Sequence, residues 1–256
     1  MTPDAPPSRH LALAGCFNVR DTGGYPTRDG GVVRWRTLLR ADALHRLDDS
    51  GRCALSEIGV RTVIDLRDDS ERTIAPSALD GVALRVLHRP IYDRSHERAA
   101  GLVADLDRLY QDMVDLHGPA LAVAIAELCE PGALPAVVHS SAGKDRTGVV
   151  IALVLEIAGV SDRHIAEDYA LTAAYLGDEF VHAVRQSKAS TGVSDAAISA
   201  VLRCPPELVL GVLRRIRQQH GSITGFLVHH GLSAAQLDGL RTALVETQRA
   251  SFASSS

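Results

Sequence analysis

A ten-residue segment with the sequence HSSAGKDRTG (139–148) gathers hydroxyls, cations and glycines in one place. It lies between two apolar runs, so we expect a strand, a tight loop and then a helix. Such a loop directs successive backbone N–H groups at one point, and the helix adds the positive end of its dipole. Arg146 can bind two oxygens with its planar fork, and Lys144 adds a point charge. The segment therefore predicts a cradle for a dianion such as a phosphate ester.

Two other kinds of loop share parts of this pattern. A Walker loop requires a glycine five residues before Gly143 and a Ser or Thr after the lysine, whereas this chain has Val138 and Asp145 there. An esterase elbow, Gly-x-Ser-x-Gly, would centre on Ser141, but His139 occupies the first glycine position, where close packing excludes a large side chain. The Walker loop is excluded, and a serine esterase stays a remote alternative.

The length and composition of the chain indicate one folded domain. With 256 residues, 46% of them apolar, the chain can bury a full hydrophobic core. We expect a single domain over residues 10–250, between disordered tails at 1–9 and 251–256, where Pro, Ser and Ala form no periodic apolar face.

Charge and motif content argue against several classes of partner. The net charge of −4 and the lack of a basic stripe interleaved with aromatics give no basis for nucleic-acid binding. Prolines stand where a signal peptide needs an apolar run, and the longest uncharged stretch, Thr147–Leu155, is too short to cross a bilayer. We therefore expect a cytoplasmic protein without integral membrane association, although export without a signal peptide stays open. Four isolated cysteines with no C-x-x-C pair argue against a zinc site.

The elements that must position the loop follow from the apolar patterns. β-Branched runs predict strands at Val32–Leu39, Val60–Leu66, Val82–Leu87 and Leu134–His139. Amphipathic stretches predict helices at Leu47–Gly59, Ala100–Leu128 (interrupted near Gly118 and Pro119), Thr147–Ala158, Ser161–Thr172, Ala174–Ser187, Pro205–Gly221 and Ser222–Gly231, and a last one that opens with a capping box, Ser233–Gln236. Strands that alternate with helices favour an α/β layer with helices on both faces of a central sheet.

The loop resembles the signature His-Cys-x-x-Gly-Lys-x-Arg-[Ser/Thr]-Gly of cysteine-dependent phosphatases, with Ser140 in the position of the cysteine. Further segments resemble, in the same order, the bacterial protein tyrosine phosphatases whose loop contains Lys-Asp-Arg: FNVRDTGGY (17–25), LLRADAL (38–44), VIDLRDDSER (63–72), IAEDYALT (165–172) and GSITGFLVHHGLS (221–233). The resemblance spans about Leu13–Leu244. It implies a phosphatase fold with a mostly parallel central sheet, an active-site loop after the last core strand, a helical lid insertion and a helical C-terminus.

The resemblance also implies roles for the loop residues. A thiolate at position 140 attacks phosphorus and forms a cysteinyl-phosphate, while Arg146 and the loop amides hold the equatorial oxygens. Asp145 is the first candidate for the proton donor, and Asp93 is the second, because loops at one edge of a sheet converge. No metal or cofactor is required, and the implied partners are a phosphorylated protein, a lipid headgroup or a small phosphorylated metabolite. The expected phosphate-binding residues are Ser141, Ala142, Gly143, Lys144, Asp145, Arg146 and Thr147, with His139 in support.

Ser140 is the departure from the signature. A loop that lowers a thiol pKa from ~8.5 to ~5 stabilises the anion by about 5 kcal/mol. The same stabilisation leaves a serine hydroxyl near ~12, so fewer than roughly one in 10⁴ is ionised at neutral pH. The chain as written should bind phosphate esters and barely turn them over. Two explanations stay open: an engineered Cys-to-Ser substrate trap, which the intact run from Lys144 to Thr147 favours, and a native pseudophosphatase.

Other polar residues have simpler interpretations. Arg20 and Asp21 lie beside two glycines, so they either frame the site or belong to a plain turn. Three charged residues at the end of a predicted strand, Asp65, Arg67 and Glu71, are typical of an ion-pair network rather than of catalysis. The adjacent His229 and His230 point in different directions on a helix, which argues against joint metal binding.

Overall fold

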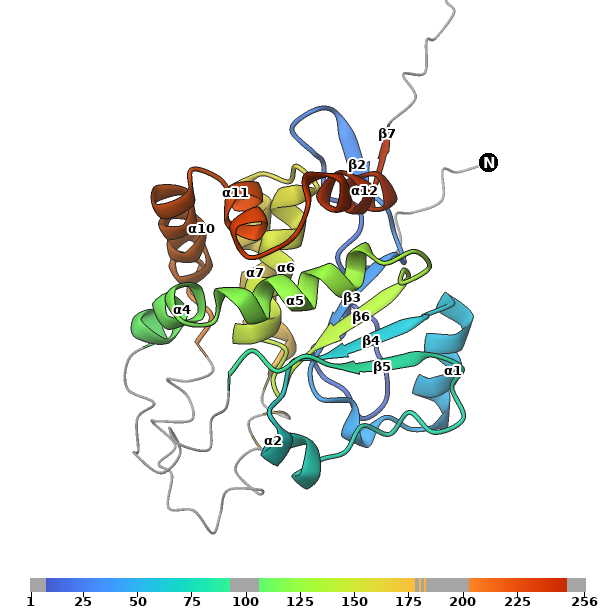
Figure 1. Ribbon diagram of the computed structural model, residues 1–256. Helices are drawn as coiled ribbons and strands as arrows, with labels where there is room; N and C mark the ends of the chain where they lie inside the picture. The colour runs from blue at the N-terminus through green and yellow to red at the C-terminus, as the bar shows by residue number, and fades with distance from the viewer. Residues whose placement is uncertain (1–7, 93–105, 178–179, 181, 183–202, 248–256) are drawn as a thin grey trace, which may run out of the picture.

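Five strands form a single sheet in the order β1-β3-β6-β4-β5. Figure 1 shows β3, β6, β4 and β5 side by side. The computed structural model describes residues 8–92, 106–177, 180, 182 and 203–247. Within this five-stranded sheet, only the pairing of β1 with β3 is antiparallel, which confirms the expected α/β fold with a mostly parallel sheet. The strand bounds are β1 Arg20–Asp21, β3 Leu38–Ala41, β6 Ala136–His139, β4 Thr62–Asp65 and β5 Arg85–His88.

The three inner strands are buried along their whole length, because both faces of the sheet are covered. On one face Val137 joins Leu39 and Val63 in a core that also receives the N-terminal segment. On the other face Val138 and Ile64 enter the larger core. This double burial explains why the strands appear in the sequence as continuous apolar runs rather than alternating ones.

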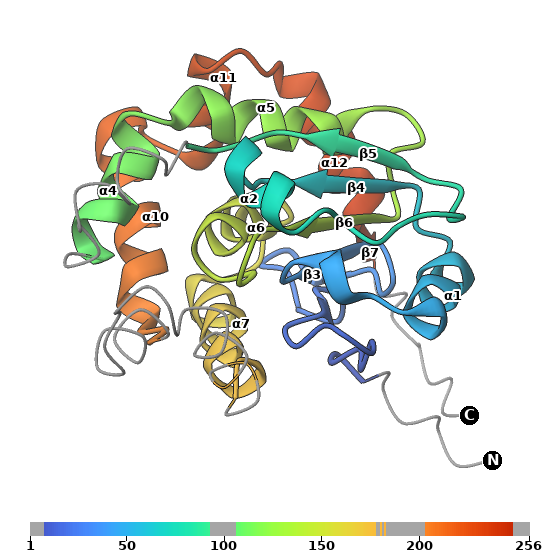
Figure 2. The same cartoon turned by 90° about the horizontal axis from the view of Figure 1, so that it is seen from below.

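Helices cover the two faces unequally. The smaller core receives η1 (Leu44–Arg46) and α1 (Asp49–Ile58), whereas the larger core receives most of the other helices, as Figures 1 and 2 show for α1 and α5. The helices of the larger core are α4 Leu106–Asp115, α5 Gly118–Cys129, α6 Asp145–Ile157, α7 Asp162–Tyr175, α10 Pro206–His220, α11 Ile223–His229 and α12 Ala234–Leu244. A short helix, α2 (Asp69–Ile74), follows β4.

Most of the predicted helix ends agree with the structure. Asp48 caps α1 by accepting the amide of Gly51, and Gly59 ends that helix with a φ of 78°. The break near Pro119 separates α4 from α5, and the predicted capping box of Ser233 and Gln236 opens α12. The predicted helix over 174–187 and the lid insertion lie largely outside the described residues.

The single strand predicted over Val32–Leu39 is wrong. The structure divides this run into β2 (Gly31–Val33) and β3, with Arg36 between them at a φ of 53°. β2 pairs with β7 (Val245–Thr247) in a separate two-stranded sheet. The turn carries the chain from one sheet to the other, and a periodicity that counts apolar residues does not detect it.

The parallel strands end together at one edge of the sheet. Ala41, His139 and Asp65 are aligned across β3, β6 and β4, so the segments that follow these strands emerge side by side. Ligands bind at this edge in open α/β sheets. Asp93, the second candidate for the proton donor, follows β5 but lies outside the described residues. Within the described ranges, no helix has the length and apolar character needed to cross a bilayer.

Candidate functional site

The predicted loop lies between β6 and α6, at the edge where the parallel strands end. His139 is the last residue of β6, and Asp145 is the first of α6. Gly143 has a φ of 64°, and a Cβ built on it would lie 2.4 Å from the carbonyl oxygen of Ala41. Only glycine fits this position, because both the backbone conformation and the neighbouring backbone exclude a side chain.

The backbone carbonyls of the loop are held from one side. Asn18 Nδ2 donates to the carbonyls of Ala142 (2.9 Å) and Gly143 (3.2 Å), and Arg40 Nη2 donates to that of Gly143 (2.7 Å). In a trans peptide the N–H points opposite to the C=O. When these carbonyls are fixed on one side of the loop, the N–H groups of the same peptides therefore point to the opposite side. The contacts support an inward-facing set of N–H donors.

A buried carboxylate holds these donors in place. Asp168 of α7 accepts from Arg20 Nε (3.2 Å) and from Arg40 Nη1 (2.6 Å). Arg20 also donates to the side chains of Asn18 and Thr172. Burial opposes ionisation of Asp168, but the two guanidinium groups outweigh it and keep its pKa below the usual value. We call Asn18, Arg20, Arg40 and Asp168 the carbonyl clamp.

The clamp is anchored by a second buried acid at the end of β3. Asp42 accepts the backbone amides of Phe17 (3.1 Å) and Asn18 (2.9 Å). Burial raises the pKa of Asp42 to about 6, although these hydrogen bonds oppose the shift. Asp42 therefore fixes the backbone from which the Asn18 amide reaches the loop.

The arginine of the loop is held from the opposite side. Arg146 Nη1 and Nη2 donate to the two carboxylate oxygens of Glu71 at 2.5 and 2.8 Å, and Ser141 Oγ donates to Glu71 Oε1 at 2.5 Å. Burial opposes ionisation of Glu71, but hydrogen bonding and attraction from Arg146 hold its pKa well below the ordinary range. We call Glu71, Arg146 and Ser141 the arginine brace.

The brace uses only some of the N–H groups of the Arg146 guanidinium. Nη1 also donates to the carbonyl of Leu66 at 3.4 Å, so both of its protons are used. Among the described residues, no hydrogen bond is found for the Nε–H of Arg146 or for the second N–H of its Nη2. This adjacent pair is the fork that matches two phosphate oxygens. The ring of Tyr92 lies 5.2 Å from the guanidinium carbon and adds a cation–π contact.

The hydroxyl of Ser140 is buried and lies next to the first turn of α6. Thr147 Oγ1 donates to Ser140 Oγ at 2.9 Å. His139 is fully buried, and its ring nitrogens have no hydrogen bond of ordinary geometry among the described residues. Its nearest acid is Asp65, 3.6 Å away, and burial lowers the pKa of His139 to about 4. The imidazole is therefore neutral at pH 7.

Lys144 and Asp145 are in contact with each other at the start of α6. Lys144 is 1% exposed, and its Nζ lies 3.2 Å from Asp145 Oδ1 and donates to the carbonyl of Arg203 at 3.1 Å. Asp145 Oδ1 also accepts from the hydroxyl of Tyr110 at 2.7 Å, and that hydroxyl lies 2.6 Å from the hydroxyl of Tyr169. Asp145 Oδ1 thus lies where it can face the ammonium of Lys144 beside the helix N-terminus.

Several other residues that the sequence analysis considered have their described partners outside residues 140–147. Asp21 accepts the backbone amides of Gly23 (2.7 Å) and Arg36 (2.6 Å), so it stabilises the turn beside β1. Asp65 pairs with Arg67 through Nε (2.9 Å) and Nη2 (2.8 Å), as the ion-pair interpretation expects. His229 is the last residue of α11 and His230 is its C-cap, and the centroids of their rings are 4.9 Å apart.

Sequence reasoning assigned no role to some of the residues that build the site. Asn18, Arg40 and Asp168 lie in the family-like segments, and for Glu71 the sequence predicts an ion-pair network rather than a catalytic role. The sequence does contain one signal for these residues, which is a charged residue inside an apolar strand or helix. Arg40 interrupts the buried strand β3, and Asp168 lies among buried residues of α7. A buried charge requires a partner, so such positions point to a network.

Comparison with known proteins places this loop in a family. A family model described as the tyrosine phosphatase family matches residues 11–246, which is nearly the whole chain. The chain belongs to this family. It is therefore a hydrolase of the protein tyrosine phosphatase type, as the loop and its flanking segments suggested.

The relatives are distant. The chain is 25% identical over 279 residues to the triple specificity protein phosphatase PtpB of Mycobacterium tuberculosis, covering 91% of this chain and 98% of PtpB. It is 26% identical over 220 residues to a tyrosine-protein phosphatase of Nostoc commune, covering 81% and 74%. Among solved structures, a Cys-to-Ser variant of TpbA from P. aeruginosa in complex with phosphotyrosine matches with a TM-score of 0.33, at 19% identity over 72% of this chain and 90% of that one.

Proposed function

We propose that the loop binds the phosphate of monoesters and that a chain with cysteine at position 140 hydrolyses them through a cysteinyl-phosphate. The observation that carries this proposal is the opposed fixation of the loop: its carbonyls are tied by Asn18 and Arg40 on one side, and Arg146 is held by Glu71 on the other. Amides and a guanidinium fixed before the substrate arrives stabilise the charge of a phosphoryl transition state without reorganisation.

In the proposed reaction, the sulfur at position 140 attacks phosphorus and the bond to the leaving oxygen breaks. Arg146 and the N–H groups of the loop hold the equatorial oxygens, and Asp145 gives a proton to the leaving oxygen. Water then cleaves the cysteinyl-phosphate. Thr147 supports the nucleophile, since its hydroxyl already donates to Oγ of residue 140 at 2.9 Å. No metal is needed in this scheme.

With Ser140 the same loop binds a phosphate ester and turns it over very slowly. No base contacts the hydroxyl among the described residues, because its neighbour is the Thr147 hydroxyl and His139 has no hydrogen bond to it. Ser141, the serine that an esterase would use, donates to Glu71 instead of contacting a histidine. The substrate-trap interpretation is favoured over a native binding module, since the charged and hydroxyl residues around position 140 are all in place.

The proposed substrates are phosphotyrosine, phosphoserine and phosphoinositide groups, with a small phosphorylated metabolite as a further candidate. A relative described as a triple specificity phosphatase supports a broad range. Phosphotyrosine bound to a Cys-to-Ser variant is recorded for TpbA, and we propose the same kind of complex for the Ser140 chain.

Restoring the thiol tests the proposal. We expect Ser140→Cys to raise kcat on an aryl phosphate by more than about 10³-fold, because the thiolate forms at neutral pH and the alkoxide does not. The activity should be unchanged by a metal chelator. The unchanged chain should bind tungstate, a phosphate-sized oxyanion, and Arg146→Ala should abolish that binding. Tungstate binding without turnover in both forms would instead indicate a recognition module, and carboxyl-ester hydrolysis by the Ser140 chain would indicate an esterase.

A further inference from the structure

The hydroxyl of Tyr110 reaches the loop from a different layer of the fold. Tyr110 lies in α4, is 2% exposed, and donates to Asp145 Oδ1 at 2.7 Å. Its hydroxyl has a single proton, and that proton is directed at Asp145. Tyr169 of α7, 2.6 Å away, is therefore the donor in the second contact. The two phenols form a relay of hydrogen bonds that ends on one carboxyl oxygen.

Among the described residues, the contacts of the Asp145 carboxyl group fall on one oxygen, Oδ1. Tyr110 donates to Oδ1, and Lys144 Nζ lies 3.2 Å from Oδ1. Within the described ranges no contact is assigned to Oδ2, and the side chain of Asp145 is 18% exposed. An oxygen that accepts a hydrogen bond and also faces an ammonium group is the one without the acidic proton, because a carboxylic acid donates through its other oxygen.

We propose that Tyr110 is a positioning residue that holds Oδ1 of Asp145, so that Oδ2 carries the proton delivered to the leaving group. This inference rests on the proposed function. As the sulfur–phosphorus bond forms and the phosphorus–oxygen bond breaks, the proton on Oδ2 moves to the leaving oxygen. The electron pair of the Oδ2–H bond stays on the carboxylate, and its new charge meets the hydroxyl of Tyr110 and the ammonium of Lys144.

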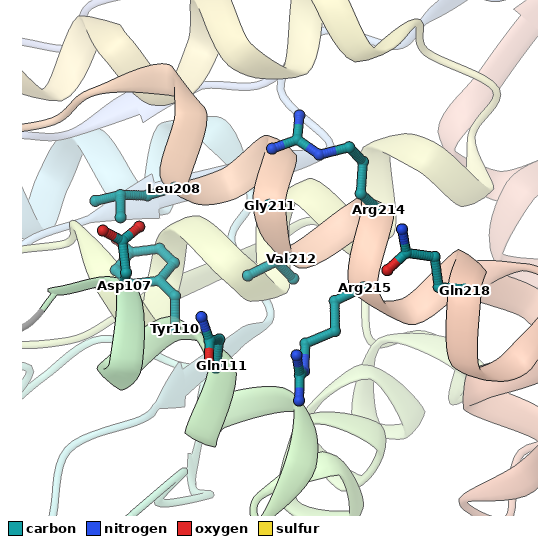
Figure 3. Close-up of a pocket in the computed structure, with 9 residues that line it drawn as sticks. All are labelled: Asp107, Tyr110, Gln111, Leu208, Gly211, Val212, Arg214, Arg215 and Gln218. Atoms are coloured by element: carbon teal, nitrogen blue, oxygen red, sulfur yellow. The ribbon is translucent and has the colours of Figure 1, made fainter.

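The surroundings of Tyr110 suit a hydroxyl that stays protonated. Burial, Asp145 and Tyr169 all raise the pKa of Tyr110 well above its ordinary value, so the phenol remains a donor at neutral pH. The ring forms part of the wall of a cavity of about 200 Å³ between α4 and α10. Figure 3 shows Tyr110 there with Gly211 and Val212 of α10. The ring is thus held between helices.

Leaving-group dependence tests this role. In the Ser140→Cys background, Tyr110→Phe should lower kcat on phenyl phosphate by about 10–100-fold, because an unactivated phenolate needs a proton to depart. On 4-nitrophenyl phosphate, whose product leaves without one, the loss should be under about threefold. Combining Tyr110→Phe with Asp145→Asn should add no further loss, since Tyr110 acts through that carboxyl group.

Matched variants separate positioning from packing. Tyr169→Phe keeps the donor to Asp145 and should have a smaller effect with the same leaving-group dependence. Gly211 lies on the opposite wall of the cavity, where an added Cβ would be 3.9 Å from the side chain of Arg214, so Gly211→Ala should leave kcat on both esters unchanged. In the Ser140 chain, Tyr110→Phe should bind tungstate as the unchanged protein does.

The outcomes that overturn the inference are distinct from failure of the proposed function. An equal loss on both esters, an additive loss with Asp145→Asn, or weaker tungstate binding by Tyr110→Phe would each assign Tyr110 a structural role. An Asp145→Asn variant with full activity on phenyl phosphate would also overturn it. If Ser140→Cys hydrolyses no ester at all, the proposed function itself fails, and the tungstate measurement still decides whether Tyr110 supports the loop.

Discussion

The carbonyl clamp and the arginine brace hold opposite sides of one loop by the same kind of contact, a buried carboxylate paired with arginine. They differ in what they fix. In the clamp, Asp168 lies between Arg20 and Arg40 and acts on the loop only through Asn18 and Arg40, which donate to its backbone. In the brace, Glu71 pairs directly with Arg146, the side chain proposed to bind phosphate.

This difference separates a structural charge from a functional one. The two guanidinium groups of the clamp share one carboxylate inside the protein, which leaves a net charge of +1, and a ligand in the loop meets only the amides that the clamp orients. The charge of Arg146 is balanced by Glu71, and it is also within the loop that would hold an anion. A bound oxyanion can therefore replace the balancing charge of the brace but not that of the clamp.

The largest expected effect is from Asp168→Asn. This change leaves two buried guanidinium groups without their counter-ion, so we expect the free energy of unfolding to fall by about 3–5 kcal/mol in urea titrations. Asp162→Asn is the matched control, because Asp162 lies in the same helix and pairs with Arg217 at the surface. That control should lose less than about 1 kcal/mol. Equal losses in the two variants would contradict the clamp.

The second effect distinguishes the brace from the clamp. Glu71→Gln keeps the size of the side chain and removes the charge opposite Arg146, so we expect a loss of about 2–4 kcal/mol. Tungstate should then raise the Tm of Glu71→Gln by more than it raises the Tm of the unchanged chain, because the anion supplies the missing charge. The Tm of Asp168→Asn should gain no more from tungstate than that of the unchanged chain. Similar tungstate gains in both variants would remove the distinction.

The sequence was sufficient to predict the loop because its chemistry is local. Gly143, Lys144 and Arg146 lie within four consecutive positions between two apolar runs, and the spacing alone predicts a strand, a loop and a helix. Family membership over residues 11–246 and the mostly parallel sheet agree with the fold that the flanking segments implied.

The supports of the loop could not be predicted in the same way, because their partners are distant in the sequence. Arg40 and Asp168 are separated by 128 positions, and Glu71 and Arg146 by 75. No pattern within either segment specifies the other. What the sequence does show is a charge in a buried strand at Arg40 and another in a buried stretch of helix at Asp168, and such charges require partners without naming them. Tyr110 carried no signal at all, since a tyrosine in an amphipathic helix is usually part of the core.

The smallest expected effect concerns two buried groups beside the loop that respond to acid in opposite directions. His139 has a pKa lowered to about 4, so the unfolded chain binds more protons and stability is lost as the pH falls below about 6.5. Asp42 has a pKa raised to about 6, so the folded chain binds more protons and stability is gained as the pH falls through that value. Between pH 7 and 5 each contributes about 1–2 kcal/mol, and the two contributions largely cancel.

Removing one group should reveal the other. In urea titrations at pH 7 and pH 5, Asp42→Asn should lose more stability on acidification than the unchanged chain does, because the opposing gain from Asp42 is removed while the loss from His139 remains. The stability of His139→Asn should change in the opposite direction relative to the unchanged chain, because the loss from His139 is removed while the gain from Asp42 remains. The comparison uses the change between the two pH values, so a constant loss from either substitution drops out. Carboxylates with lowered pKa, such as Glu71, stay ionised in both states above about pH 5 and add nothing to the difference. Parallel pH profiles in the two variants would mean that neither group is buried as described, and the anchor that Asp42 gives to Asn18 would then lose its support.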